Sequence, residues 1–210
     1  LDVIGSGWSP ELLQGYLPAR ASGGRWRSHG DLALEAQLRP AAAGGWRGTA
    51  SVSSASGGLA PLRRRASGRP PPPDLMRYDA LRVQAEFDSD GVRAEFGAGF
   101  DGDGRVDARL ASGWVADSAL DGTVDISTRQ IGWLELFSPD IVAPKGQLQG
   151  VLQLGGTREH PRLGGNAQLS GFTAELPALG ITLRDGALRL DAQADGNAHL
   201  AGQLQSGEGV

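Results

Sequence analysis

The sequence predicts an all-β fold: an elongated, curled, mostly antiparallel β-sheet of half-pipe or solenoid-like shape, with two short helices. Most of the 210 residues alternate between apolar and polar side chains with a period of two. The connections between these runs are short and rich in Asp and Gly. Glycine is frequent, with 33 residues, whereas aromatic residues make up only 6% of the chain. This composition suits many turns and closely spaced strands better than a thick, tightly filled core.

The two helices are expected near the N-terminus and in the middle of the chain. The first follows Ser9 and Pro10 and runs to Leu17. Serine is a favoured N-cap and proline fits the first helical position. The second covers 129–137, where apolar side chains recur at helical spacing, and Ser138-Pro139 ends it.

The strands are expected wherever apolar and polar residues alternate, because side chains of a strand point to opposite faces in turn. Parallel strands buried on both faces would give continuous apolar runs instead. Turns such as 88–91, 101–104 and 195–197 join neighbouring runs as hairpins. The expected strands cover 31–38, 46–52, 81–87, 92–100, 105–110, 120–126, 147–154, 163–170, 188–194 and 198–205.

Three segments are expected along the chain. Residues 1–60 form a β-rich segment with the N-terminal short helix. Residues 61–74 contain three consecutive arginines and four consecutive prolines. Proline cannot donate to a sheet ladder, so this segment is predicted to be an exposed, flexible loop. Residues 75–210 form the main sheet.

The charge pattern and the motifs argue against catalysis. The net charge is −4 and no basic stripe is present, so nucleic acid is not expected as a partner. Asp101-Gly102-Asp103-Gly104 resembles part of a calcium loop, but the distal bidentate Glu is not in register. The histidines, His29, His160 and His199, lack metal-ligand spacing. We therefore expect no enzyme, no catalytic residue, no metal site and no cofactor.

The apolar side of such a sheet must be covered by something. A second sheet, the same sheet curled on itself, or a ligand can cover it. Glycines at inward positions, Gly122, Gly150, Gly165 and Gly202, favour a rolled sheet with an open lumen. Lipid acyl chains would suit that lumen. The alternatives are a β-sandwich or β-solenoid adhesion module with an internally packed core, or, less favoured, a β-solenoid hydrolase.

The stretch from 131 to 209 resembles the repeat region of the TamB family, which is related to AsmA. A short amphipathic element at 131–137 is followed by the pattern G-x-L-x-G, then G-T-x-x-x-P-x-L-x-G, then G-I-x-L-x-D. These patterns fall at 146–150, 156–165 and 180–185. The N-terminal part shares the alternation without clear motifs. The chain is therefore expected to be a middle or C-terminal section of a longer protein.

The resemblance implies a curled β-sheet (a β-taco) with a hydrophobic interior, in a periplasmic protein anchored in the bacterial inner membrane through a segment outside this chain. It also implies phospholipid transport between the membranes and support of outer-membrane protein assembly. The expected partners are phospholipid acyl chains and an outer-membrane barrel of the Omp85 type (TamA-like). The residues predicted to contact lipid are Val92, Phe96, Phe100, Leu148, Leu152, Leu154, Leu163, Leu169, Leu188 and Leu190.

Overall fold

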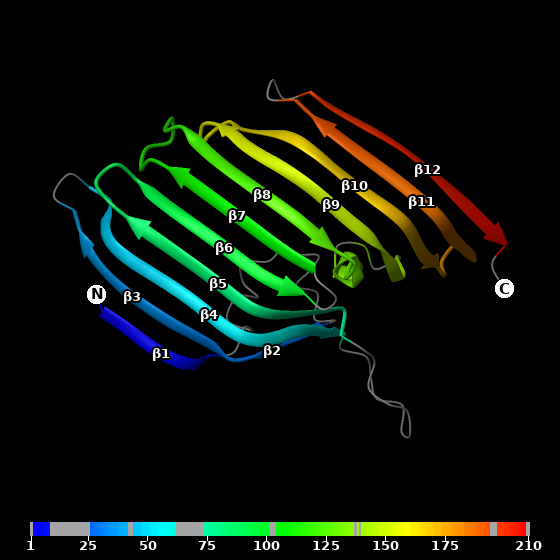
Figure 1. The fold of residues 1–210 in the computed structure, drawn as a ribbon, viewed down its shortest axis with the longest axis horizontal. Coiled ribbons are helices and arrows are strands. Elements are labelled where there is room, and N and C mark those ends of the chain that lie inside the picture. Colours follow the sequence, from blue (N-terminus) through cyan, green and yellow to red (C-terminus); the bar gives the residue numbers. More distant parts are fainter. Residues whose placement is uncertain are drawn as a thin grey trace.

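The computed structural model describes residues 2–8, 26–41, 44–61, 74–100, 104–136, 138, 140–193 and 197–208. Their strands form a single antiparallel sheet of twelve strands that is curled but not closed (Figure 1). The all-β, curled and antiparallel fold predicted from the sequence is therefore confirmed. The strands are β1 (Asp2–Trp8), β2 (Trp26–Gly30), β3 (Leu32–Pro40), β4 (Trp46–Pro61), β5 (Met76–Phe87), β6 (Val92–Phe100), β7 (Gly104–Ser112), β8 (Leu120–Thr128), β9 (Val142–Gly156), β10 (Pro161–Leu176), β11 (Ile181–Ala192) and β12 (Ala198–Glu208).

The strand order follows the chain almost without exception. From β3 to β12 each strand pairs with the next one, so the sheet is a long meander. At the N-terminal end β1 pairs with β3. The long strand β4 pairs with β3 through its first half and with β2 through its last residues, so β2 and β3 lie end to end along it. Strands β1 and β12 lie at opposite ends of the sheet (Figure 1).

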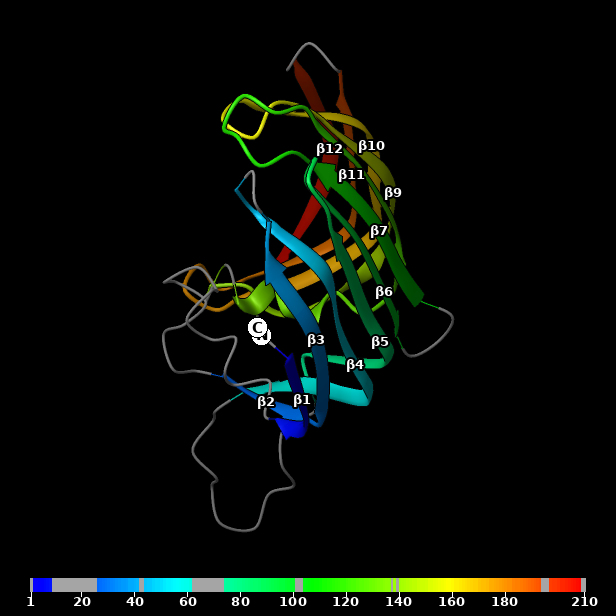
Figure 2. The same ribbon diagram turned by 90° about the vertical axis from the view of Figure 1, so that its left-hand side faces the viewer.

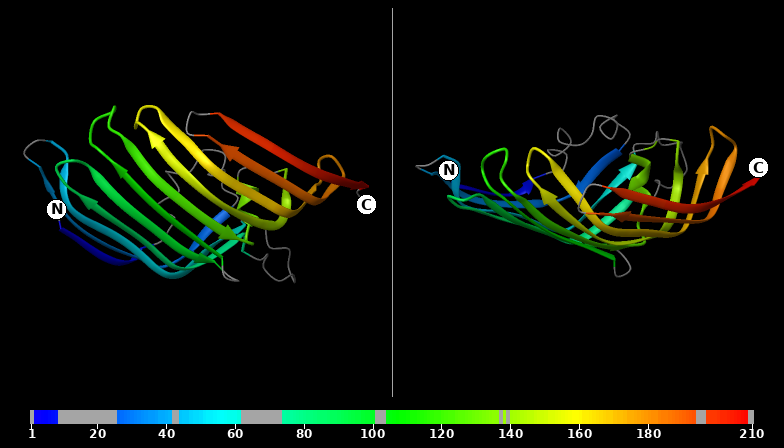
Figure 3. Two further views of the ribbon diagram at one scale, coloured as in Figure 1. Left: turned by 45° about the horizontal axis from the view of Figure 1, so that its top comes forward. Right: turned by 90° about the horizontal axis from the view of Figure 1, so that it is seen from above.

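The sheet bends into a trough because β5 and β10 each contain a bulge, and the two bulges lie toward the same end of the strands. The register shifts between Asp79 and Arg82 of β5, and again between Ser170 and Thr173 of β10. Ala80 has a φ of 47°, and Gly171 has a φ of 58°. An extra residue in one strand bends that strand and increases its twist. The ends beyond these points turn inward, as Figures 2 and 3 show.

The only fully packed core among the described residues lies at one place inside the trough. A 3-10 helix, η2 (Gly132–Leu136), connects β8 to β9 there. Ile131, which precedes it, is 1% exposed and packs with Phe172 and Ala174 of β10. The partly buried residues around this cluster are Leu134, Ile141, Leu148, Leu169 and Leu183.

The prediction of two short helices is not borne out, because the described residues contain no α-helix. The helix expected from Pro10 to Leu17 lies outside them. The second segment forms only the 3-10 helix η2. Gly132 lies against the backbone of Leu75, where an added Cβ would collide with the carbonyl oxygen. The segment has to bridge β8 and β9 within this tight contact, and a helix this short gains little from propagation.

A candidate apolar groove

The strand pairing gathers the apolar side chains into continuous rows that cross the sheet. The longest row runs from β1 to β12 through directly paired residues. Its ten steps of about 4.8 Å give a path of roughly 48 Å across the strands. Its members are Gly5, Leu34, Val52, Val83, Phe96, Ala108, Val124, Leu152, Gly165, Ala192 and Ala198.

A neighbouring row contains small side chains over four strands. Ala36, Ala50, Ala85 and Ala94 pair in succession from β3 to β6. The row on one side of them contains the larger Val83 and Phe96, and the row on the other side contains Phe87 and Val92. The alanines therefore form a shallow furrow between two ridges, and the furrow runs across the strands.

These rows occupy the concave face of the sheet. The 3-10 helix η2 lies inside the curve of the trough (Figure 2). Ile131 next to it packs on Leu148 and Leu169, which belong to the apolar rows. The apolar face is therefore the inner face, as expected for a half-pipe.

All ten residues predicted to contact lipid lie on this concave face. The alternation and register of their strands place Val92, Phe96 and Phe100 on β6, Leu148, Leu152 and Leu154 on β9, Leu163 and Leu169 on β10, and Leu188 and Leu190 on β11.

Among the described residues, the cover over this face differs from one part to another. Leu148 and Leu169 contact the Ile131 cluster, so a part of their surface is already covered. In contrast, Phe96 is 36% exposed and Leu163 is 41% exposed. The groove is thus filled near η2 and open around Phe96 of β6 and over the first part of β10, whereas Ala98 of β6 is buried.

The inward glycines do not all leave open space. The register places Gly122, Gly150, Gly165 and Gly202 on the apolar face, as predicted. At Gly122 the Leu110 side chain is close enough that a Cβ would lie 3.2 Å from its Cδ1. At Gly202 the side chain of Leu188 fills the space. Neighbouring leucines therefore spread over these glycines and smooth the floor of the groove.

The convex face is polar and carries ion pairs between exposed side chains. Arg109 Nε lies 3.5 Å from Glu95 Oε1, and Arg105 Nε lies 3.1 Å from Asp107 Oδ2. Arg189 Nε donates to Asp191 Oδ2 at 2.8 Å. The hydrogen bond from Arg189 lowers the pKa of the Asp191 carboxyl. Exposed pairs of this kind add little stability, but their charged groups keep the convex face hydrated.

Sequence reasoning identified the groove's large residues but not its furrow or its rim. The alanines of β4, β5 and β6 had the correct alternation, yet their alignment across strands depends on register, which a single strand does not encode. Trp114, in the connection between β7 and β8, stacks on Phe87 of the apolar face. It lies in a loop, where period-two alternation gives no signal.

The described residues contain no group of three or more His, Asp or Glu side chains that could hold a metal ion. Asp101 and Asp103 of the calcium-like turn lie outside them. His29 Nε2 lies 3.0 Å from Asp74 Oδ2. None of the helices in the described part of the chain is long and apolar enough to cross a membrane.

A single curled sheet with a polar convex face and an apolar, partly open concave face defines a class of β-trough proteins. A family model described as the N-terminal domain of TamB matches residues 13–169. The chain therefore belongs to the TamB family, and such a protein is associated with the bacterial envelope. No curated protein and no solved structure gives a match. The match covers the part without clear motifs and also the first two motif patterns, at 146–150 and 156–165. It describes an N-terminal domain, whereas the motifs suggested a middle or C-terminal section.

Proposed function

We infer that the concave face is a groove for the acyl chains of phospholipids, in a TamB-family protein that moves phospholipid between the inner and outer membranes. The observation that supports this most is the row of paired apolar residues from β1 to β12, which is only partly covered by other described residues. A monomer rarely exposes an apolar surface of this extent without a functional reason. Each buried methylene of an acyl chain would contribute about 0.8 kcal/mol.

The geometry suits a lipid tail more than a compact ligand. The furrow of alanines crosses the strands and has apolar ridges on both sides, so an extended chain would lie along it. The polar headgroup would remain in water above the groove. The role of the residues is apolar contact rather than chemistry, and we propose no catalytic step. An Omp85-type barrel in the outer membrane and support of outer-membrane protein assembly belong to the same proposal, by family resemblance.

The experiment is native mass spectrometry of the protein purified from the periplasm, followed by lipid extraction and identification. We expect bound phospholipid in the wild type. Phe96→Asp and Leu152→Asp, both on the concave face, should remove it while the circular dichroism spectrum stays β-rich. Val151→Asp is the matched control, because Val151 is adjacent to Leu152 on β9 but is 45% exposed on the convex face.

A lipid-free, stably folded wild type would contradict the proposal. So would lipid retained by Phe96→Asp. Either result would favour the structural alternative, in which the face packs against other protein. Among the described residues, such packing exists at the Ile131 cluster and at Phe87, on which Trp114 stacks.

A further inference from the structure

The rim of the trough is formed by hairpin ends that lie close together. The β3–β4, β5–β6, β7–β8 and β9–β10 connections lie toward the same side of the sheet (Figure 1). The β7–β8 connection, residues 113–119, leans toward the concave side (Figure 2). It carries Trp114, whose side chain contacts two other hairpins.

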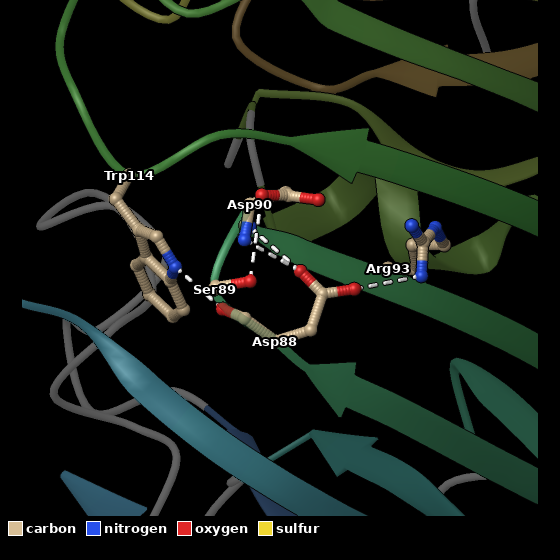
Figure 4. A network of polar contacts seen from close by, with 6 residues as sticks. Asp88, Ser89, Asp90, Arg93 and Trp114 are labelled. Carbon is tan, nitrogen blue, oxygen red and sulfur yellow. Dashed lines mark hydrogen bonds and ion pairs between the residues drawn. The ribbon is translucent and has the colours of Figure 1, made fainter. Parts of the chain in front are cut away.

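Trp114 ties the β5–β6 hairpin to the β7–β8 loop. Its Nε1–H donates to the carbonyl oxygen of Asp88 at 2.8 Å (Figure 4). Its ring stacks on Phe87, with centroids 6.2 Å apart and an interplanar angle of 17°. The turn that receives it is itself well fixed, because the Asp88 carboxylate accepts from the backbone N–H groups of Asp90 and Gly91 at 2.8 and 3.0 Å.

The same ring also reaches the β3–β4 hairpin. It lies against Gly45, where an added Cβ would be 2.7 Å from the ring atom Cε2. Gly45 also has a φ of 80°, which side chains rarely adopt. A glycine is therefore required at position 45 both by the positive φ and by the contact with the tryptophan ring.

Arg158 holds the loop from the other side. Its Nη1 donates to the carbonyl oxygens of Gly113 at 3.2 Å and Trp114 at 2.8 Å. Its backbone N–H donates to Ser118, and that of Glu159 donates to Ala116, at 3.1 and 3.0 Å. The β9–β10 hairpin is thus joined to the same loop. A clasp of Trp114 and Arg158 links hairpins from β3 to β10.

We propose that Trp114 sets the width of the groove and so determines which apolar ligands fit against the alanine furrow. The described sheet has a single layer and one small packed core, so its curvature depends on local ties rather than on a second layer. The clasp is the tie that spans most strands on the rim side. The part of this proposal that concerns ligands rests on the proposed function, whereas the part that concerns width does not.

The width is tested by electron paramagnetic resonance distance measurements. The chain has no cysteine, so Arg47→Cys at the rim end of β4 and Glu175→Cys beyond the bulge of β10 give two unique spin-label sites on opposite sides of the groove. We expect Trp114→Ala to shift the distance distribution to longer values and to broaden it. Trp46→Ala is the control, because Trp46 is a 44% exposed tryptophan on the same β3–β4 hairpin. An unchanged distribution in Trp114→Ala would overturn the proposal.

Two milder variants keep the test decisive if Trp114→Ala does not fold. Trp114→Phe keeps an aromatic ring but loses the N–H donor, and Arg158→Gln loses the guanidinium contacts to the loop. Each should shift the distance distribution to longer values, but by less than Trp114→Ala does. If both leave it at the wild-type position, the clasp does not set the width.

The expected effect of Trp114 on ligand selectivity is measured separately. Native mass spectrometry with an equimolar mixture of palmitate and a two-chain phosphatidylethanolamine should show a higher ratio of phospholipid to fatty acid in Trp114→Ala than in the wild type or Trp46→Ala. An unchanged ratio in a variant whose distances have increased would overturn the specificity role alone. If the wild type binds neither probe, the proposed function fails while the width result stands.

Discussion

Residues on the concave face contribute unequally to the free energy of unfolding, although they share one pattern of alternation. Ile131 is buried and contacts Phe172, whereas Phe96 is partly open to solvent. We expect Ile131→Ala to lower the free energy of unfolding by roughly 2–4 kcal/mol, because it leaves a cavity. Phe96→Ala should cost about 1 kcal/mol, since less apolar area leaves contact. Urea denaturation followed by circular dichroism measures both, and equal costs would contradict this division of the groove.

The turn at Asp88 should make the rim sensitive to acid. Backbone N–H groups of Asp90 and Gly91, together with Arg93, lower the pKa of the Asp88 carboxyl. A carboxyl whose pKa is lower in the folded protein contributes its stabilisation fully above the ordinary pKa of about 4, and loses it as the pH falls below that value. The amide chemical shifts of Asp90 and Gly91 should therefore move on acidification below about pH 4.

Asp88→Asn is the matched variant for this titration. It keeps the shape of the side chain but removes its charge, so the acid-dependent shift should disappear. If the amide chemical shift of Gly91 follows the same pH dependence in the variant as in the wild type, another group controls the turn.

At the scale of the element, a bulge marks the point where the apolar–polar alternation of a strand changes phase. In β10 the apolar positions Ala167 and Leu169 are followed by Phe172 and Ala174, so the phase changes at Ser170-Gly171. Deleting Gly171 would restore the regular alternation, so Phe172 would stay on the concave face, but β10 would lose the bulge that bends its end around the Ile131 cluster. We expect the deletion to abolish the cooperative thermal transition followed by circular dichroism.

Gly171→Ala is the control for that deletion. No atom lies within 4 Å of the position of an added Cβ, so only the φ of 58° opposes the substitution. The cost should be about 1–2 kcal/mol. A deletion that is no more harmful than this substitution would show that the bulge and its bend are not needed for the stability of the sheet.

The same bulges explain which parts of the fold the sequence predicted. The expected strand at 163–170 ends where the phase of β10 changes, and the expected strand at 81–87 begins just beyond Ala80, where β5 is bent. Strands β1 and β2 were missed, because β1 contains two glycines and β2 does not alternate. The local pattern identified the two faces of the sheet, whereas the bends in β5 and β10, the furrow and the clasp arise from pairing and contacts between strands.

At the scale of the whole molecule, the meander makes the sheet a one-dimensional array, because nearly every strand contacts only its chain neighbours. Stability in such arrays is a sum of unit terms and nearest-neighbour couplings. Opening should therefore propagate inward from the two ends, like a zipper. We expect amide hydrogen exchange to be slowest in β6–β9 and fastest in β1 and β12, and Val106→Asp in β7 to split the array into two independently exchanging halves. Uniform exchange along the chain would instead indicate one all-or-none unit, in which a ligand bound anywhere in the trough would stiffen every strand equally.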